Sequence, residues 1–286
     1  MLAPAAPALA ACYRICRDVA KRHSKTFYLS SLCLAPERRR AVWAVYAFCR
    51  TADDIVDGGL PAERRLDALD AWERGLCAAY DGRADDPVFV ALADAVATYR
   101  IPLQPALDLL RGARMDVGTR RYETDDELRE YCYLVASTVG LLVLPILGAL
   151  TPEASRYGAV LGHAMQMTNI LRDVGEDARM GRIYLPAESL RRAGCTEQTI
   201  LAGCVGAPFA ALMRDEIERV RRLYAEAEPG IALLAEESRY AVRVALVLYR
   251  GILDRIEHNG YDVFTRRAHV PVATKMLTAA RVRFAR

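Results

Sequence analysis

Lysine and asparagine are scarce in this sequence of 286 residues, and the motifs of several common enzyme classes are missing. Lysine occurs at three positions although Lys and Arg together number 39, and asparagine occurs at two. The sequence contains no GxGxxG, no GxxxxGK and no GxSxG. These absences argue against nucleotide-dependent chemistry and against a serine hydrolase.

Cysteine is present, but not in a pattern that binds zinc or builds a disulfide framework. The eight cysteines include no CxxC pair, and the four histidines do not lie at zinc-ligand spacing from them. Several cysteines fall within apolar helical stretches, which favours buried, reduced thiols. The segment Met1–Tyr13 lacks the basic start of a signal peptide. We therefore expect a cytoplasmic location.

The charges are nearly balanced, and this excludes a partner chosen by charge alone. The chain has 39 basic and 36 acidic residues, which gives a net charge of +3. So small an excess argues against nucleic-acid binding. A hydrophobic fraction of 53% with a charged fraction of 26% also excludes a disordered chain. The sequence predicts a folded globular protein.

One uncharged stretch, from Tyr131 to Pro152, is long enough to span a bilayer. Pro145 near its middle and the polar pair Ser137 and Thr138 weaken that interpretation, and there is no second such stretch. A helix that is buried on all sides has the same composition. We favour the buried helix over a membrane span.

Helical signals dominate the whole chain, because apolar residues recur at helical spacing and alternating β-branched runs are scarce. No stretch resembles a linker or a repeat. We expect one all-α domain over residues 1–286, with residues 1–10 disordered. The expected helices are Ala10–Lys21, Pro36–Val56, Pro61–Tyr80, Pro87–Tyr99, Pro105–Met115, Asp125–Thr138, Leu141–Leu150, Glu153–Asp177, Pro186–Arg192, Glu197–Leu201, Ala207–Glu226, Glu237–Asn259 and Val272–Ala280.

A first acidic motif closes the apolar helix expected at Pro36–Val56. Asp53 and Asp57 are four residues apart, so both carboxylates lie on one helix face with about 5–6 Å between their Cβ atoms. Repulsion between them favours a cation at this place, and a hard divalent ion that also binds phosphate suits the spacing. The alternative is a solvated acidic helix end.

A second acidic motif follows the apolar segment YGAVLGHAM. Asn169, Asp173 and Asp177 recur every four residues, with Gln166 one turn earlier. Such a stripe on a core-like helix faces either a cation or a wet cleft, or it belongs to an amphipathic helix that enters solvent. Each motif also has an arginine, Arg50 or Arg172, and acids beside guanidinium groups are what metal-bridged diphosphate recognition requires.

Five stretches of the chain resemble the squalene/phytoene synthase family, and most closely its bacterial phytoene synthases. The likeness covers nearly the whole chain and occurs in the stretches HSKTFYLSS (23–31), AVWAVYAFCRTADDIVD (41–57), YCYLVASTVG (131–140), QMTNILRDVGEDARMGRIYLP (166–186) and NGYDVFTRRAHVP (259–271). The resemblance implies a class I isoprenoid synthase fold, an all-α bundle around a central apolar cavity. It also implies a prenyltransferase of carotenoid biosynthesis. Such an enzyme joins two geranylgeranyl diphosphates head to head through prephytoene diphosphate, with release of two diphosphates, to give phytoene.

The resemblance assigns roles to named residues. It implies Mg²⁺ or Mn²⁺ as the cofactor without NADPH, and metal ligation by Asp53, Asp57, Asn169, Asp173 and Asp177. Diphosphate would be bound by Ser24, Thr26, Arg50, Arg172, Lys275 and one or both of Arg266 and Arg267. The walls of the substrate cavity, which keep water from carbocations, would include Phe27, Tyr46, Phe48, Tyr131, Val135 and Gln166. The final proton acceptor stays open among Tyr131, Gln166 and the departing diphosphate.

Two rival functions remain at this point. A dehydrosqualene or squalene synthase would use farnesyl diphosphate, and the length of the cavity cannot be read from a sequence. A non-catalytic relative that acts as an assembly factor is disfavoured because both acidic motifs are complete. Because the product is apolar, we also expect peripheral attachment to the inner face of the cytoplasmic membrane, where downstream carotenoid enzymes would act. The balanced charge predicts no nucleic-acid partner.

Overall fold

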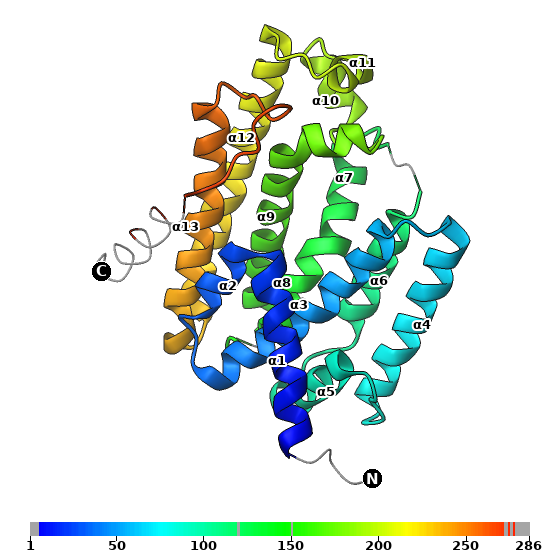
Figure 1. Ribbon diagram of the computed structural model, residues 1–286. Helices are drawn as coiled ribbons and strands as arrows, with labels where there is room; N and C mark the ends of the chain where they lie inside the picture. The colour runs from blue at the N-terminus through cyan, green and yellow to red at the C-terminus, as the bar shows by residue number, and fades with distance from the viewer. Residues whose placement is uncertain (1–5, 119–120, 150, 272–273, 275–276, 278–286) are drawn as a thin grey trace.

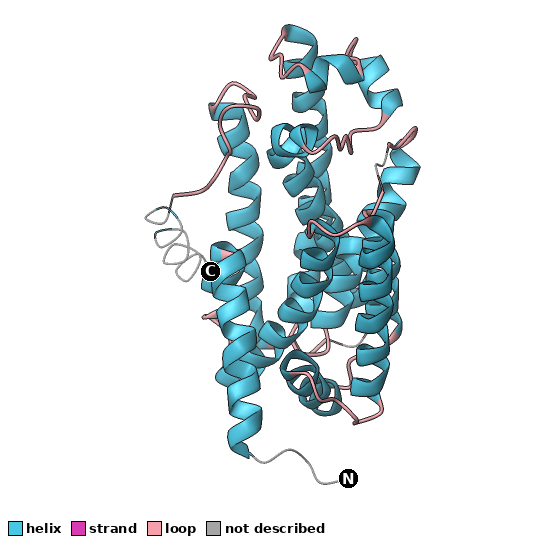
Figure 2. Cartoon of the chain, turned by 45° about the vertical axis from the view of Figure 1, so that its right-hand side comes forward, coloured by secondary structure: helices cyan, strands magenta, loops and turns pink. Residues whose placement is uncertain are grey.

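The computed structural model describes residues 6–118, 121–149 and 151–271, together with 274 and 277. Every regular element of this part is helical (Figures 1 and 2), which confirms the expected all-α class. The elements are α1 (Ala6–His23), α2 (Lys25–Ser31), α3 (Pro36–Asp57), α4 (Ala62–Tyr80), α5 (Pro87–Tyr99), α6 (Gln104–Met115), α7 (Asp125–Cys132), the π-helical η1 (Tyr133–Ser137), α8 (Thr138–Val143), α9 (Pro152–Arg179), α10 (Ala187–Arg192), α11 (Glu197–Leu201), α12 (Ala207–Ala227), the 3₁₀-helical η2 (Glu228–Leu233) and α13 (Glu236–His258).

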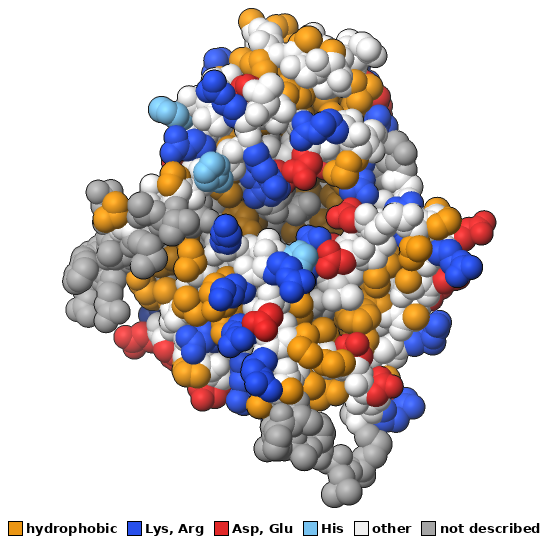
Figure 3. Space-filling view, viewed as in Figure 1, with side chains coloured by type: hydrophobic (Ala, Val, Ile, Leu, Met, Phe, Trp, Pro, Cys, Tyr) orange, Lys and Arg blue, Asp and Glu red, His pale blue; other side chains and the backbone are white. Residues whose placement is uncertain are grey.

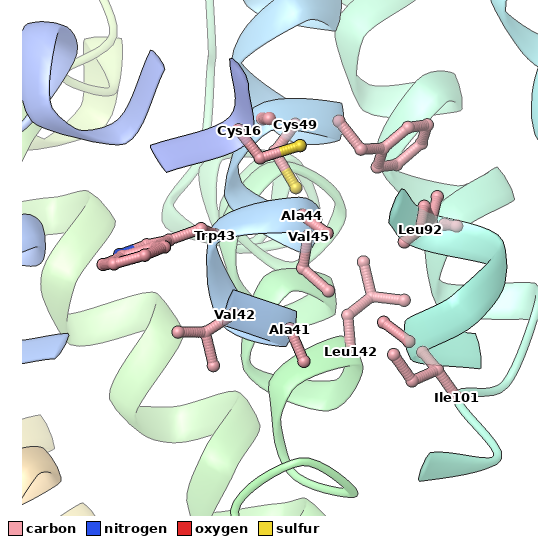
Figure 4. Close-up of a cluster of buried hydrophobic side chains, with 14 of the residues drawn as sticks. Cys16, Ala41, Val42, Trp43, Ala44, Val45, Cys49, Leu92, Ile101 and Leu142 are labelled. Carbon is pink, nitrogen blue, oxygen red and sulfur yellow. The ribbon is translucent and has the colours of Figure 1, made fainter. Parts of the chain in front are cut away.

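Two long helices organise the interior. Helix α3 is packed between α1, α5 and α6, and its apolar run enters a first buried cluster. Figure 4 shows part of this cluster, in which α3 contributes Ala41–Val45 and Cys49 next to Cys16, Leu92, Ile101 and Leu142. Helix α9 is packed against α12, η1, α8 and α13 and forms the centre of a second cluster. That the chain is a single domain stays a prediction.

The ends of these helices follow from local sequence. Pro36 and Pro152 occupy the first turns of α3 and α9, where a missing N–H costs nothing. Thr151 caps α9, and its hydroxyl accepts a hydrogen bond from the amide of Ala154 at 3.1 Å. Helix α1 begins at Ala6, four residues before the expected start at Ala10, and residues 1–5 lie outside the described part. The expected disorder of residues 1–10 stays a prediction.

The uncharged stretch begins at Tyr131 in the last turn of α7 and continues through η1 and α8. These three elements form one continuous rod. The separate helix expected at Leu141–Leu150 is wrong, because the rod ends at Val143 and Pro145 follows in a series of turns. Leu134, Leu142 and Ile146 are buried within the protein. Within the described residues, no helix has both the length and the apolar character needed to cross a membrane.

Glycines allow α9 to lie unusually close to this rod. A Cβ on Gly162 would come within 2.4 Å of the Ala136 carbonyl oxygen and 2.8 Å of the Ser137 Cα atom. A Cβ on Gly140 would lie 2.4 Å from the carbonyl oxygen of Gly158. Because these neighbours are backbone atoms, they cannot turn aside as a side chain could. The two glycine contacts therefore fix the distance between α9 and the rod.

This contact predicts the effect of adding one methyl group. We expect Gly162→Ala to lower the free energy of unfolding by about 1–3 kcal/mol, since the new Cβ overpacks a backbone contact. Gly59→Ala is the matched control, because a Cβ at Gly59 meets nothing within 4 Å. Urea denaturation of both variants measures the difference. Equal stability of the two variants would show that α9 can move away from the rod at no cost.

Candidate active site

The two acidic motifs share two charged neighbours, Asp116 and Arg182. Asp53 and Asp57 lie in the last turns of α3, and Asp173 and Asp177 lie in the last turns of α9. The negative charge of Asp116, the residue that follows α6, raises the pKa of both Asp53 and Asp177. Figure 3 shows one face of the molecule, which is hollowed near its centre and has charged side chains around the hollow. The structure thus brings both predicted motifs to one site.

Asp53 and Asp177 carry the clearest electrostatic signal of the site. Among the described residues, neither carboxylate has a hydrogen bond or an ion pair. Crowding by protein atoms raises the pKa of each to about 7, and the neighbouring Asp57 or Asp173 adds to the effect. Asp53 is nevertheless exposed to solvent. Two facing carboxylates without a partner are suited to receive a cation.

The donor atoms of the site fit a hard divalent cation. Carboxylate oxygens come from both helices, and the amide of Asn169 lies on the same stripe of α9 as Asp173 and Asp177. In the described part, no three His, Cys, Asp or Glu side chains already surround a common metal position. A hard divalent ion can be held by one or two carboxylates and take its remaining ligands from water and phosphate.

Arginines form ion pairs with several of the acids. Arg172 forms a two-pronged ion pair with Asp173, at 2.8 and 2.5 Å, and Arg267 approaches the same carboxylate at 3.0 Å. On α3, Arg50 pairs with Asp54 through its Nε atom at 2.9 Å. Burial alone would raise the pKa of Asp173, but Arg172 and Arg267 hold it below its usual value.

The structure separates the two members of the basic pair at 266–267. Arg267 reaches Asp173 and also Glu176, whose carboxylate lies 3.5 Å away. Arg266 is exposed and lies near Asp262, whose pKa is lowered chiefly by hydrogen bonds from Thr265 and less by the charge of Arg266. The sequence left this choice open, and the geometry assigns the site position to Arg267. Lys275, also predicted to bind diphosphate, lies outside the described residues.

The predicted Ser24 and Thr26 belong to a polar corner beside α13. The Ser24 hydroxyl caps α2 by accepting a hydrogen bond from the amide of Phe27 at 3.3 Å, and Thr26 lies in the first turn of α2. Tyr249 of α13 hydrogen-bonds to Ser24 and is close enough to Arg172 for that charge to lower its pKa, although burial raises the pKa overall. Tyr249 could not be predicted from the sequence, because a single tyrosine on an amphipathic helix carries no motif.

Aromatic side chains line one flank of the site. Phe27 of α2 stacks on Tyr46 of α3 with ring centroids 4.5 Å apart, and both rings are half-buried. Asp53 raises the pKa of Tyr46, which places this ring beside the acids. The structure corrects the prediction that Phe48 lines the cavity. It lies in the core with Trp72 and Phe89, because a residue two positions from Tyr46 points to another face of the helix.

Tyr131 belongs to a cluster that the sequence did not predict. Its hydroxyl donates a hydrogen bond to Asp116 at 2.7 Å, and the Tyr184 hydroxyl donates to the other oxygen of Asp116 at 3.1 Å. Both rings pack against Tyr122. Asp116 lies outside the motif stretches and Tyr184 lies at the end of the 166–186 stretch, and only the fold brings them to Tyr131.

The remaining predicted residues line α9 and the rod. Gln166 accepts a long hydrogen bond of 3.5 Å from the Asn169 amide, which places both on the same stripe. Val135 is half-buried in the π-helical η1, where it faces Gly112 of α6. Single π-helical turns are frequent at functional sites.

Comparison with known proteins identifies the family. The family model for squalene/phytoene synthase matches residues 20–274. The chain belongs to this family. It is 48% identical over 273 residues to the chloroplastic phytoene synthase of Daucus carota, covering 93% of this chain and 68% of that protein. It is 44% identical to the phytoene synthase of Arthrospira platensis, covering 93% of this chain and 90% of that one.

Solved structures of the squalene/phytoene synthase family share the fold. A dehydrosqualene synthase in complex with ligand has a TM-score of 0.91 at 34% identity, covering 96% of each chain. A squalene synthase from Alicyclobacillus acidocaldarius has a TM-score of 0.82 at 32% identity, covering 89% of this chain and 96% of that one. The expected terpenoid synthase fold is therefore confirmed, and the chain is a prenyltransferase of this family.

The raised pKa values predict how stability without metal depends on pH. Protonation of Asp53 and Asp177 favours the folded state, because their pKa is higher there than in an unfolded chain. This stabilisation is complete below the ordinary value of 3.8 and is lost as the pH rises through about 7. We expect metal-free protein to melt at a higher temperature at pH 6.5 than at pH 8.

The double variant Asp53→Asn/Asp177→Asn is the control for this measurement. Without the two titrating groups, the difference in melting temperature between pH 6.5 and pH 8 should shrink, and the variant should be the more stable protein at pH 8. Differential scanning calorimetry in the presence of a chelator provides both numbers. A pH dependence that survives the double substitution would assign it to other groups.

Proposed function

We propose that this chain is a phytoene synthase, which joins two molecules of geranylgeranyl diphosphate head to head and releases two diphosphates. The observation that carries the proposal is the meeting of two acidic motifs, from α3 and α9, with arginines on both sides. The identity of 44–48% to phytoene synthases over 93% of the chain supports the C20 substrate.

The metal of the proposal is Mg²⁺, with Mn²⁺ as a substitute. Asp53 and Asp57 would hold it from α3, and Asn169, Asp173 and Asp177 from α9. When bound, it supplies Lewis acidity that draws electron density onto the leaving diphosphate. The absence of NADPH from the proposal follows from its product, because phytoene formation involves no reduction.

Arginines complete the diphosphate site. Arg50, Arg172 and Arg267 carry planar guanidinium groups that bind phosphate oxygens in the same two-pronged way in which Arg172 now binds Asp173. The hydroxyl groups of Ser24 and Thr26 lie at the start of α2, where helix N–H groups also favour an anion. These groups stabilise the charge that develops when the allylic C–O bond breaks.

The apolar flank controls what happens after this ionisation. The C–O bond electrons leave with diphosphate, the double bond of the second substrate attacks the allylic cation, and the loss of a proton closes the cyclopropyl ring of the intermediate. A second ionisation, a rearrangement and the loss of one proton then give phytoene. The stacked Phe27 and Tyr46 offer π faces to the cations and help to exclude water.

Tyr131 is poorly suited to take the final proton. Its hydroxyl already donates to Asp116, and burial raises its pKa well above the ordinary value, so the phenol stays neutral. A neutral phenol is a weak base. This favours the departing diphosphate, with Gln166 as a polar group nearby, and gives Tyr131 the role of shaping the cavity.

The rival functions have different supports. Dehydrosqualene and squalene synthases share the fold at 34% and 32% identity, below the identity to phytoene synthases. A non-catalytic assembly factor would not need the acids of the site, and all of them are retained. Cytoplasmic location, attachment to the inner membrane face and contact with downstream carotenoid enzymes stay predictions.

One matched pair of variants tests the diphosphate site. We expect Arg267→Gln to lower kcat/KM by about 10- to 100-fold, because a charge-assisted bond to diphosphate is lost. Arg266→Gln removes the same charge from the neighbouring exposed position and should stay within about twofold of wild type. Steady-state assays at saturating Mg²⁺ measure both, with circular dichroism as the folding control. Equal losses in the two variants would contradict the assignment of Arg267.

The substrate is tested by product analysis. Purified protein is incubated with Mg²⁺, without NADPH, and separately with geranylgeranyl or farnesyl diphosphate. We expect a C40 triene from the C20 substrate, and no hydrocarbon from Asp173→Asn, which removes a metal ligand and little volume. A C30 product alone would change the substrate to farnesyl diphosphate. No product from either substrate would support a non-catalytic relative.

A further inference from the structure

Arg182 lies at the centre of the acidic site, although neither acidic motif contains it. It follows the end of α9, and its backbone amide donates a hydrogen bond to the Asp177 carbonyl at 2.8 Å. Gly181, with φ of 75°, makes the turn that directs the chain back. The Arg182 Nη1 atom lies 3.0 Å from Asp57 Oδ1 on α3. This ion pair joins residues 125 positions apart.

The electrostatics place Arg182 among three carboxylates. Burial raises the pKa of Asp116 and Asp177, and the charge of Arg182 offsets part of this rise, while the charges of Asp57 and Asp116 in turn raise the pKa of Arg182. The three acids come from three different helix ends, those of α3, α6 and α9. Arg182 is therefore a fixed positive charge where these helix ends meet.

The other arginines of the site are engaged elsewhere. Arg50 pairs with Asp54, while Arg172 and Arg267 share Asp173. Within the described residues, Arg182 is the cation in contact with Asp57. Its guanidinium occupies an oxygen of the same carboxylate that the proposed function assigns to the metal.

The geometry of the Arg182–Asp57 ion pair allows another cation to replace Arg182 at Asp57. It has a single contact rather than a two-pronged one, and the Asp57 side chain is 49% exposed while Arg182 is 18% exposed. Ion pairs that open to water contribute little to stability. A divalent cation that also contacts the facing acids therefore gains more from Asp57 than the guanidinium does.

We propose that Arg182 is the counter-ion of the acidic site in the metal-free protein and that a divalent cation displaces it from Asp57. This inference rests on the proposed function, because it takes Asp57 as a metal ligand. Displacement breaks the bridge between α3 and the segment after α9, so metal binding also frees that segment. Arg182 thus weakens metal binding while it keeps the empty site from being destabilised by its own acids.

The experiment measures Mn²⁺ binding without substrate, from the electron paramagnetic resonance signal of free Mn²⁺. We expect Arg182→Gln to bind Mn²⁺ about tenfold more tightly than wild type, since both a competitor and a repelling charge are removed. Arg182→Lys keeps the charge and should stay within about threefold. Arg114→Gln is the matched control, because Arg114 bridges Asp70 and Glu73 away from this site.

Thermal melting provides the second readout. Metal-free Arg182→Gln should melt below wild type, and saturating Mn²⁺ should raise its melting temperature by more than it raises that of wild type. A merely structural ion pair predicts a lower melting temperature with unchanged or weaker Mn²⁺ binding, and that result would overturn the proposal.

The proposed function can fail separately. If wild type converts geranylgeranyl diphosphate while Arg182→Gln binds Mn²⁺ as wild type does, only the role of Arg182 is wrong. If neither protein binds Mn²⁺ and no hydrocarbon forms, the metal site and the displacement fall together. Mn²⁺ binding by Arg182→Gln alone would support Arg182 as the group that blocks the site.

Discussion

Repulsion between carboxylates is the constraint on which the rest of this structure depends. Asp53 and Asp57 of α3 and Asp173 and Asp177 of α9 are grouped around Asp116 at the end of α6, which adds a further negative charge. An isolated pair of helices with these side chains would separate in water. The protein must therefore hold the acids together by contacts made elsewhere and keep them available to a cation.

Those contacts are apolar and lie away from the acids. Helix α3 is held by its buried Ala- and Val-rich face, and α9 is held against the rod by the glycine contacts at Gly158 and Gly162. Because backbone meets backbone there, α9 has little freedom to move away from its neighbour. Packing of this kind supplies the rigidity that positions a catalytic site to within fractions of an ångström. Burial in the two cores thus offsets the electrostatic strain at the site.

The sequence predicted what local spacing determines and missed what tertiary packing determines. Acids four residues apart share a helix face, so both motifs were found and most helix limits agree within a few residues. Asp116, Tyr184 and Tyr249 were missed, because their partners lie 15 to 225 positions away and nothing local marks them. Phe48 was placed wrongly, since aromatic character does not tell which face of a buried helix a ring occupies. The choice between Arg266 and Arg267 also needed the fold, which brings only Arg267 to α9.

The use of arginine around the acids has a physical reason of its own. A guanidinium group keeps its charge at every pH of interest, and its planar fork fits a carboxylate and a phosphate equally well. In the resting site, Arg172 forms two parallel bonds to Asp173. When cations take over the carboxylates and diphosphate arrives with them, the arginines can exchange a carboxylate for a phosphate of matching shape. Each arginine then has a charged hydrogen-bond partner before and after the exchange. No charge is therefore left unpaired when metal and diphosphate bind. A lysine, with a compact ammonium group and no fork, could satisfy either partner but could not keep the same geometry through the exchange.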